Sequence, residues 1–177
     1  MKGIAAHPEV HVAKLNFHIM VSQIELKLAN DSYRDDIIRL LRLENLPVND
    51  LPAHLHDFLV ALDSNIVIGA VGLERYENCG LLRSLVVNPS YRNQNIAGEL
   101  ISRLESNAAA SGIESIYLLT ETAPVYFERK GYSKITRDIV PDVLFSSSEF
   151  SHVCPTSAFV MKKSTKRDSM EKEEPNH

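Results

Sequence analysis

Two charged side chains interrupt strands that are otherwise apolar. Glu74 ends one apolar stretch, and Arg83 lies inside the next, LLRSLVV. A hairpin centred near Asn78 and Cys79 would place them opposite one another, which predicts either an ion pair or a functional site. In the functional interpretation, Arg83 binds a substrate anion with its planar guanidinium, while Glu74 orients it or acts as a base through water. Ser84 is a weaker substrate-binding candidate, since regular alternation directs it to the other face unless a bulge intervenes.

A polar turn between an apolar strand and a long helix is the second candidate site. In LLRSLVVNPSYRNQNIAGELISRL the strand ends at Asn88-Pro89, and the helix follows directly. The first N–H groups of a helix have no partner inside it, so they favour anions, particularly phosphates. A plain connection between a strand and a helix is the alternative, because the pattern alone does not distinguish the two.

Other polar side chains are weaker candidates. Glu121 follows a predicted strand at the end where a cleft would open, so it is a second candidate base, although a solvated surface carboxylate is the more common case. His152 and Cys154 are compatible with a metal or arsenical site, but two ligands without a third favour a packing or turn role. We therefore predict no metal site, and we assign Tyr76 and Tyr117 to packing.

Periodicity predicts the elements that position these residues. Alternating residues indicate a strand over 24–28, and helical spacing indicates a helix that Asp31 or Ser32 caps and that ends before Pro47. A second small helix is expected to carry Leu51 and Leu55. The other expected elements are a helix over 93–110 ended by Gly112, a short helix over 123–130, and strands over 58–62, 66–73, 81–87, 113–120, 132–136 and 158–162. This order predicts a mixed α/β fold of the α+β type, with antiparallel hairpins followed by helix crossovers.

Composition limits the classes of function. The chain has 177 residues, 44% hydrophobic and 24% charged, with a net charge of −4. The length and composition predict one globular domain, and the net charge disfavours a general nucleic-acid binder. The sequence has no apolar run of membrane-spanning length. Residues 24–163 are expected to fold, 1–23 to be an extension without a signal-peptide apolar region, and 164–177 to be a disordered charged tail. Two widely separated cysteines predict free thiols in a cytoplasmic protein.

The strand, turn and helix resemble the cofactor segment of the GNAT acetyltransferase superfamily. The family loop Arg/Gln-x-x-Gly-x-Gly/Ala follows a strand ending in apolar-x-Val-x-Pro, and this chain has LVVNP and then RNQNIA. The resemblance implies acetyl-CoA as co-substrate, with its pantetheine arm along Leu85, Val86 and Val87. Asparagine, the non-glycine residue that best tolerates positive φ, stands at the loop's glycine position. The residues implied to hold the pyrophosphate are Arg92, Asn93, Gln94, Asn95, Ile96, Ala97 and Gly98.

A second stretch, TETAPVYFERKGY, is similar to the family signature Asn-x-x-Ala-x-x-Leu-Tyr-x-Lys/Arg-x-Gly-Phe. Thr120 stands at the asparagine position, and Phe127 stands at the tyrosine that often protonates the departing thiolate. The resemblance implies that both contact the cofactor. Tyr126 precedes Phe127, and one residue turns a helical side chain by about 100°. Tyr126 therefore cannot simply take the place of that tyrosine; it stays a catalytic candidate, and the identity of the acid stays open.

Three stretches, VGLERYENCGLLRSLVV, LLTETA and SSSEFSHVCPTSAFVM, look like the arsenic-resistance N-acetyltransferase branch of this superfamily. The resemblance implies a single-domain GNAT fold, with helices on both faces of a mostly antiparallel central sheet. It also implies direct acetyl transfer to a small amino-acid-like amine of the arsinothricin or phosphinothricin kind, and a homodimer. No nucleic-acid or membrane partner is expected. The alternatives are a glutamate-type amino-acid or protein-amine acetyltransferase, a CoA-binding module without chemistry, and an arsenical-binding protein.

Overall fold

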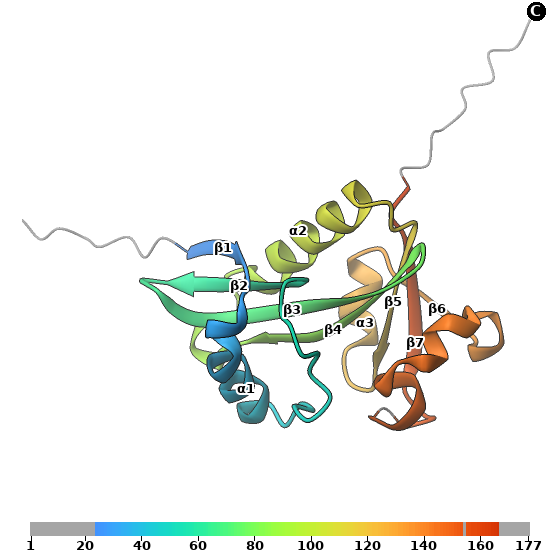
Figure 1. Ribbon diagram of the computed structural model, residues 1–177, viewed down its shortest axis with the longest axis horizontal. Coiled ribbons are helices and arrows are strands. Elements are labelled where there is room, and N and C mark those ends of the chain that lie inside the picture. The colour runs from blue at the N-terminus through green and yellow to red at the C-terminus, as the bar shows by residue number, and fades with distance from the viewer. Residues whose placement is uncertain (1–23, 154, 167–177) are drawn as a thin grey trace, which may run out of the picture.

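A seven-stranded sheet organises the computed structural model, which describes residues 24–153 and 155–166 (Figure 1). Its strand order is β1-β2-β3-β4-β5-β7-β6, and within this described part β4 and β5 are the one parallel pair. The strands are β1 (Ile24–Leu28), β2 (Phe58–Asp63), β3 (Ile66–Tyr76), β4 (Cys79–Val87), β5 (Ser115–Thr120), β6 (Ser133–Ile135) and β7 (Phe159–Ser164). The helices are α1 (Arg34–Leu43), α2 (Ile96–Ala110) and α3 (Pro124–Arg129).

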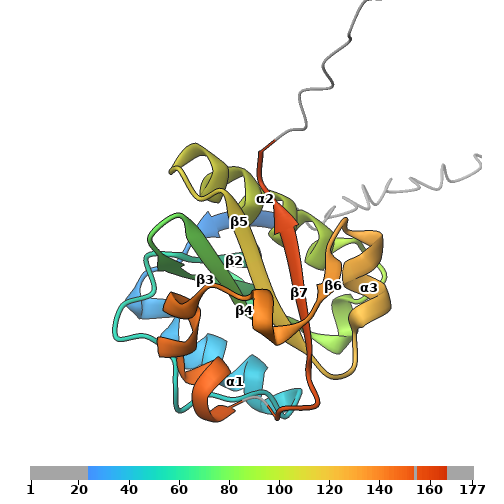
Figure 2. The ribbon, with the colours of Figure 1, turned by 90° about the vertical axis from the view of Figure 1, so that its right-hand side faces the viewer.

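Helices cover both faces of this sheet, as the two views show (Figures 1 and 2). On one face, Leu100 of α2 and Phe127 of α3 share a buried cluster with Leu118 of β5. On the other face, Leu40 of α1 packs in a cluster with Phe58 of β2. Burial of such side chains stabilises the layers by about 1.5–3 kcal/mol each. The expected mixed, mostly antiparallel sheet with helices on both faces is confirmed, and no helix of the described residues is long and apolar enough to span a membrane.

Residues 137–153 form short helical turns that the sequence analysis does not predict. Two are 3-10 turns, Arg137–Ile139 and Asp142–Ser146, and the third is a π-helical turn, Glu149–Val153. Leu144 and Phe150 from these turns share a buried cluster with residues of β4, β5 and β7. The segment therefore covers part of the sheet face that α1 leaves open, and it brings Glu149 beside β4.

Two local expectations for the N-terminal half are wrong. The side chain that caps the first helical turn is Asn30, which accepts a hydrogen bond from Ser32 N, rather than Asp31 or Ser32. The second small helix does not form: the chain around Pro52 is irregular, and Arg34 donates to the carbonyl oxygens of Pro52 and Ala53. A proline that lacks an N–H, and carbonyls already bonded to a side chain, both act against a helix there.

The C-terminal boundary lies later than composition predicts. β7 runs to Ser164, and Thr165 N donates to Glu114 O at 3.0 Å. Lys166 pairs with Glu114 at 2.9 Å, so the folded region includes at least these residues beyond the expected limit at 163. The expectations for 1–23, for Cys154 and for 167–177 lie outside the described residues.

The two hairpins differ in how well the sequence predicts their register. Ser64 and Asn65 have φ of 50° and 71° and join β2 to β3 in the expected tight turn. The β3–β4 turn is centred one position earlier than expected, because Tyr76 pairs with Cys79. The strand partner of Glu74 is consequently Leu81, and that of Arg83 is Gly72, so Glu74 and Arg83 are diagonal rather than opposite.

Gly72 is predicted to be essential to the packing of β2 against β3. A Cβ at this position would lie 2.3 Å from Cζ of the fully buried Phe58 ring. Gly72→Ala should therefore lower the free energy of unfolding by about 1–3 kcal/mol, measured by urea denaturation. Gly69→Ala on the same strand is the control and should cost less, because its nearest contacts would be 3.2 Å away. Equal stability of wild type and Gly72→Ala would contradict this packing.

Candidate active site

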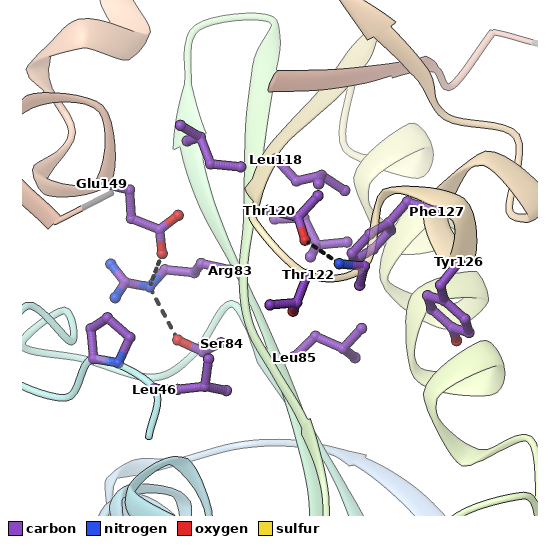
Figure 3. A pocket seen from close by; sticks show the side chains of 14 residues that line it. Leu46, Arg83, Ser84, Leu85, Leu118, Thr120, Thr122, Tyr126, Phe127 and Glu149 are labelled. Atoms are coloured by element: carbon purple, nitrogen blue, oxygen red, sulfur yellow. Dashed lines mark hydrogen bonds and ion pairs between the residues drawn. The ribbon is translucent and has the colours of Figure 1, made fainter. Parts of the chain in front are cut away.

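A cavity of about 230 Å³ opens where β4 and β5 separate (Figure 3). The two strands pair only over Cys79–Leu81 and Ser115–Tyr117 in the described structure, so the later part of β4 has no strand partner on that side. The cavity is lined mostly by apolar side chains. Its lining residues are Leu46, Pro47, Leu82, Arg83, Ser84, Leu85, Leu118, Leu119, Thr120, Thr122, Ala123, Tyr126, Phe127 and Glu149.

A bulge in β4 directs consecutive residues into this cavity. Ala70 pairs with Val86, whereas Gly72 pairs with Arg83, so β4 contains one more residue than β3 between these points. Ser84 has φ of 55°, in the left-handed region that few non-glycine residues adopt. Because of this bulge, Arg83, Ser84 and Leu85 all line the cavity. Regular alternation would have turned Ser84 to the other face.

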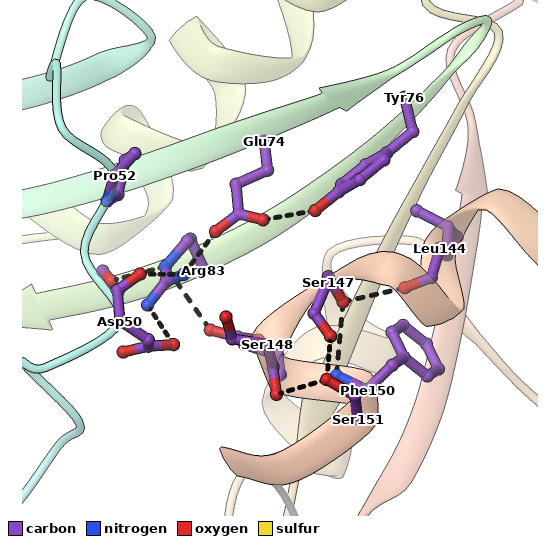
Figure 4. Close-up of polar contacts among 12 residues, drawn as sticks. Asp50, Pro52, Glu74, Tyr76, Arg83, Leu144, Ser147, Ser148, Phe150 and Ser151 are labelled. Carbon is purple, nitrogen blue, oxygen red and sulfur yellow. Dashed lines mark hydrogen bonds and ion pairs between the residues drawn. The ribbon is translucent and has the colours of Figure 1, made fainter.

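The guanidinium of Arg83 is buried and held by three carboxylates (Figure 4). Nη2 lies 2.7 Å from Asp50 Oδ2, Nη1 contacts Glu74 Oε1, and Nε lies 3.5 Å from Glu149 Oε1. Nη1 also donates to Asp50 O at 3.1 Å and Nε to Ser84 Oγ at 3.2 Å. The guanidinium therefore has intramolecular partners on every side, and its geometry does not support the expected role of binding a substrate anion.

Glu74 has both carboxylate oxygens engaged and does not line the cavity. Its Oε2 accepts a hydrogen bond from Tyr76 Oη at 2.6 Å, while Oε1 contacts Arg83. Burial raises the pKa of Tyr76 well above its usual range, and the Glu74 carboxylate adds to this, so the hydroxyl stays a donor. Tyr76 therefore supports the carboxylate cluster as well as packing. The expected position of Glu74 as a base facing a substrate is not what the geometry shows.

Glu149 is the carboxylate that lines the cavity, and the sequence analysis does not assign it a role. It is 8% exposed and reaches Arg83 from the π-helical turn (Figure 3). Burial raises its pKa to about 7, with Asp50 and Glu74 adding to the rise and Arg83 opposing it. A carboxyl group that ionises near neutral pH is suited to accept a proton. A single acid in the run VLFSSSEFSHV is the signal from which it could have been found.

The loop before α2 adopts the conformation that glycine would provide. Asn93 and Asn95 have φ of 64° and 59°, both left-handed, and α2 begins at Ile96 rather than at 93 as expected. Arg92 is exposed and pairs with Glu44, and Gln94 is also exposed. The first N–H groups of α2 thus follow directly on a loop with two asparagines in the conformation expected of the family glycines.

Comparison with known proteins identifies the fold. Residues 54–134 match the family model of an acetyltransferase (GNAT) domain. N-acetylglutamate synthase from Neisseria gonorrhoeae, in complex with coenzyme A and L-arginine, has a TM-score of 0.70 and 16% identity over 82% of this chain and 34% of that chain. A GNAT-family acetyltransferase from Staphylococcus aureus Mu50 has a TM-score of 0.66 and 21% identity over 81% of this chain and 100% of that chain. The fold is that of the GNAT acetyltransferases.

Curated relatives with similar sequences are acetyltransferases that this chain matches in part. An amino-acid acetyltransferase from Ectopseudomonas mendocina is 27% identical over 93 residues, 51% of this chain and 22% of the relative. An uncharacterized N-acetyltransferase from Chlorobaculum tepidum is 28% identical over 99 residues, 55% of this chain and 63% of the relative. The chain therefore covers less than two thirds of either relative.

In this GNAT fold, the remaining predicted residues fall into two groups. Thr120, Tyr126 and Phe127 line the cavity, and Tyr126 lies on the side away from Glu149 (Figure 3). Burial raises the pKa of Tyr126, which keeps its hydroxyl protonated. Glu121 is exposed and does not line the cavity, although Thr120 and Thr122 on either side of it do.

The predicted cofactor residues divide between the two faces of the sheet and the loop. Leu85 and Val87 pack on the α2 side, whereas the buried side chain of Val86 belongs to the α1 side. Ile96 and Gly98 are buried at the start of α2, and Ala97 is partly buried. Only backbone groups of Val86 are thus available to a ligand in the cavity. In the described residues, no group of three His, Cys, Asp or Glu side chains is arranged to hold a metal ion.

Proposed function

We propose that this chain is an acetyl-CoA-dependent N-acetyltransferase that acetylates the amine of a small acceptor. The separation of β4 from β5 carries the proposal, because it leaves the later part of β4 without a strand partner beside an apolar cavity. The left-handed loop and the start of α2 follow β4 in the chain, and residues 88–98 do not line the cavity itself. The GNAT family match and neighbours crystallised with coenzyme A support it. Cytoplasmic location and a homodimer stay predictions.

The residues present fit the co-substrate. A Cβ at Gly98 would lie 2.3 Å from Asn95 Oδ1 and 2.6 Å from Lys130 Nζ, so a larger residue would require these two side chains to move, whereas glycine leaves the first turn of α2 uncrowded. The N–H groups of that turn would hold the pyrophosphate, as the helix start is a suitable anion site. Unpaired backbone groups of Leu85 to Val87 would hold the pantetheine arm. Acetyl-CoA supplies the acetyl group as a thioester when bound.

The chain's own residues divide the remaining tasks. Glu149, ionised above about pH 7, would take the proton of the acceptor's ammonium, directly or through water. Backbone N–H groups of the bulged part of β4 would polarise the thioester carbonyl. Tyr126 is proposed as the acid that protonates the departing thiolate, from the side of the cavity away from Glu149. We propose direct transfer without a covalent acyl-enzyme, and the position of Cys79 outside the cavity lining is consistent with it.

The test follows release of free CoA with acetyl-CoA and a panel of amines. The named relatives and the resemblance to the arsenic-resistance branch put glutamate, phosphinothricin and arsinothricin in the panel, together with other amino acids, simple amines and a lysine peptide. Release of thiol that depends on an added amine supports the proposal. Binding of acetyl-CoA without thiol release for any amine would instead favour a CoA-binding module without chemistry.

The left-handed conformation of Asn95 is predicted to matter for CoA binding. Asn95→Gly should bind CoA as tightly as wild type, whereas Asn95→Val should bind about tenfold more weakly, because a β-branched residue resists φ near 59° by about 1–2 kcal/mol. Titration calorimetry with CoA measures both. Wild-type affinity in Asn95→Val would show that the loop geometry is not part of the site.

Cys79 is predicted to be dispensable for turnover. It lies at the start of β4 in the buried cluster with Leu81 and Tyr117, does not line the cavity, and has a pKa that burial raises. A double variant, Cys79→Ser with Cys154→Ser, should therefore keep its kcat, since direct transfer uses no thiol. Circular dichroism confirms folding. A folded but inactive double variant would point to a covalent acyl-enzyme.

A further inference from the structure

The charges around the cavity are unbalanced. Asp50, Glu74 and Glu149 surround a single cation, Arg83, and all four side chains are largely buried. With the three acids ionised, the cluster has a formal charge of −2, from three negative charges and one positive. Apart from Arg83 and Glu149, the described residues that line the cavity are uncharged at neutral pH. The excess of negative charge therefore comes from Asp50 and Glu74, which contact Arg83 beside the cavity without lining it.

Among the described residues that line the cavity, Arg83 is the one cation that could pair with an acceptor carboxylate. The three guanidinium nitrogens of Arg83 already contact oxygen atoms of Asp50, Glu74, Glu149 and Ser84. A second anion would have to displace one of these carboxylates and then remain beside it, which is unfavourable where water is excluded. An ammonium group meets the opposite situation, because Glu149 lines the cavity (Figure 3), and Asp50 and Glu74 contact the same guanidinium as Glu149 does (Figure 4).

We infer that the acceptor is a cationic amine without a carboxylate next to its amino group, such as an alkylamine, an arylalkylamine or a diamine. This inference rests on the proposed acetyl transfer and narrows its substrate class. It departs from the amino-acid acceptors that the names of the curated relatives suggest. The ammonium head lies at Glu149, and Leu46, Pro47 and Leu119 offer apolar surface to the rest of the molecule.

Matched pairs that differ by one carboxylate test the inference. We would measure kcat/KM from CoA release for phenethylamine against phenylalanine, putrescine against ornithine, and cadaverine against lysine. The decarboxylated member should be at least about tenfold better in each pair, which corresponds to about 1.4 kcal/mol. Equal or better turnover of the amino acids would overturn the inference while leaving the proposed acetyltransferase intact.

A charge variant away from the cavity lining tests the cause. Asp50→Asn removes one negative charge behind Arg83 and should reduce the ratio of amine to amino-acid kcat/KM severalfold. The matched control is Glu128→Gln, which removes an exposed acid that pairs with Lys134 and does not line the cavity, and it should leave the ratio unchanged. An unchanged ratio in Asp50→Asn would show that the cluster charge does not select the acceptor.

A binding measurement separates this inference from the proposed function. If no amine releases CoA, the proposed transfer is wrong, and the same pairs are then titrated into the CoA-saturated protein by calorimetry. Tighter binding of phenethylamine or putrescine than of the paired amino acid supports a cation-selective site. Equal binding, tighter binding of the amino acid, or binding of neither member overturns it.

Discussion

Glu149→Gln is expected to lower kcat for acetyl transfer by about 10²- to 10⁴-fold, the usual contribution of a positioned general base. The amide keeps the size of the side chain but cannot accept the ammonium proton. Glu149 is the titratable carboxyl among the described lining residues, so no other acid is placed to replace it. The measurement is CoA release at saturating acceptor, with Glu128→Gln as an exposed control. A kcat for Glu149→Gln within a fewfold of wild type would remove Glu149 from the mechanism.

The pH dependence of the same variant gives a second readout. Burial raises the pKa of Glu149 most, to about 7, and three charged groups act on it as well: Arg83 lowers this pKa, whereas Asp50 and Glu74 raise it. Because the base works only when ionised, wild-type kcat/KM should rise with pH and level off above about 7. Glu149→Gln should lose this inflection and keep any rise that comes from the acceptor's own amine. An identical inflection in both proteins would assign it to another group.

Arg83→Leu is expected to lower the free energy of unfolding by about 3–5 kcal/mol at neutral pH. The sequence-based hypothesis links Arg83 to acceptor binding, whereas the geometry makes it the cation that allows three acids to be buried together. Removing Arg83 leaves the negative charges of these carboxylates without a neutralising cation. The site is buried, since Arg83 itself is 3% exposed. The loss should therefore be a large part of the total stability of a domain this size.

Urea denaturation followed by circular dichroism measures this loss, at about pH 7 and about pH 5. Without the cation, the contribution that lowers the pKa of Glu149 is lost, so this pKa rises further and the variant should recover stability as the pH falls and Glu149 binds a proton. Arg83→Lys keeps the charge without the planar fork and should lose less. It also keeps the prediction testable if Arg83→Leu does not fold. Equal stability of Arg83→Leu and wild type at pH 7 would show that the cluster is not coupled as described.

Local patterns predict most of the fold, because most of its elements bury one face. The alternation in β1, the hairpin of β2 and β3, and the apolar face of α2 all follow from the periods of strands and helices. Gly112 and Gly131 end their helices with φ of 85° and 86°, as left-handed stops. The segment 137–153 could not be predicted this way, since its turns are too short to show a period and are held by contacts with β4, β5 and β7.

The site is predictable only where one stretch of chain holds the information. Arg83 is a candidate from the sequence because a charged residue inside an apolar strand is unusual. The loop before α2 can be recognised because the strand, Asn93, Asn95 and the helix follow one another in one stretch of chain. Asp50 and Glu149 join Arg83 from segments on either side of it in the chain, and no spacing rule connects them. The displaced β3–β4 turn and the bulge at Ser84 further change which residues meet. Such long-range pairings depend on packing of the whole domain.

Because β4 and β5 pair over a short stretch, the sheet consists of two halves that are joined near one end. Strands β1 to β4 form one half and β5 to β7 form the other, and in the described structure the pairing between β4 and β5 covers only Cys79–Leu81 against Ser115–Tyr117. The angle between the two halves sets the width of the cavity beyond this pairing. Leu144 and Phe150 pack against the paired residues and do not line the cavity, so they affect the cavity width without contacting a bound ligand.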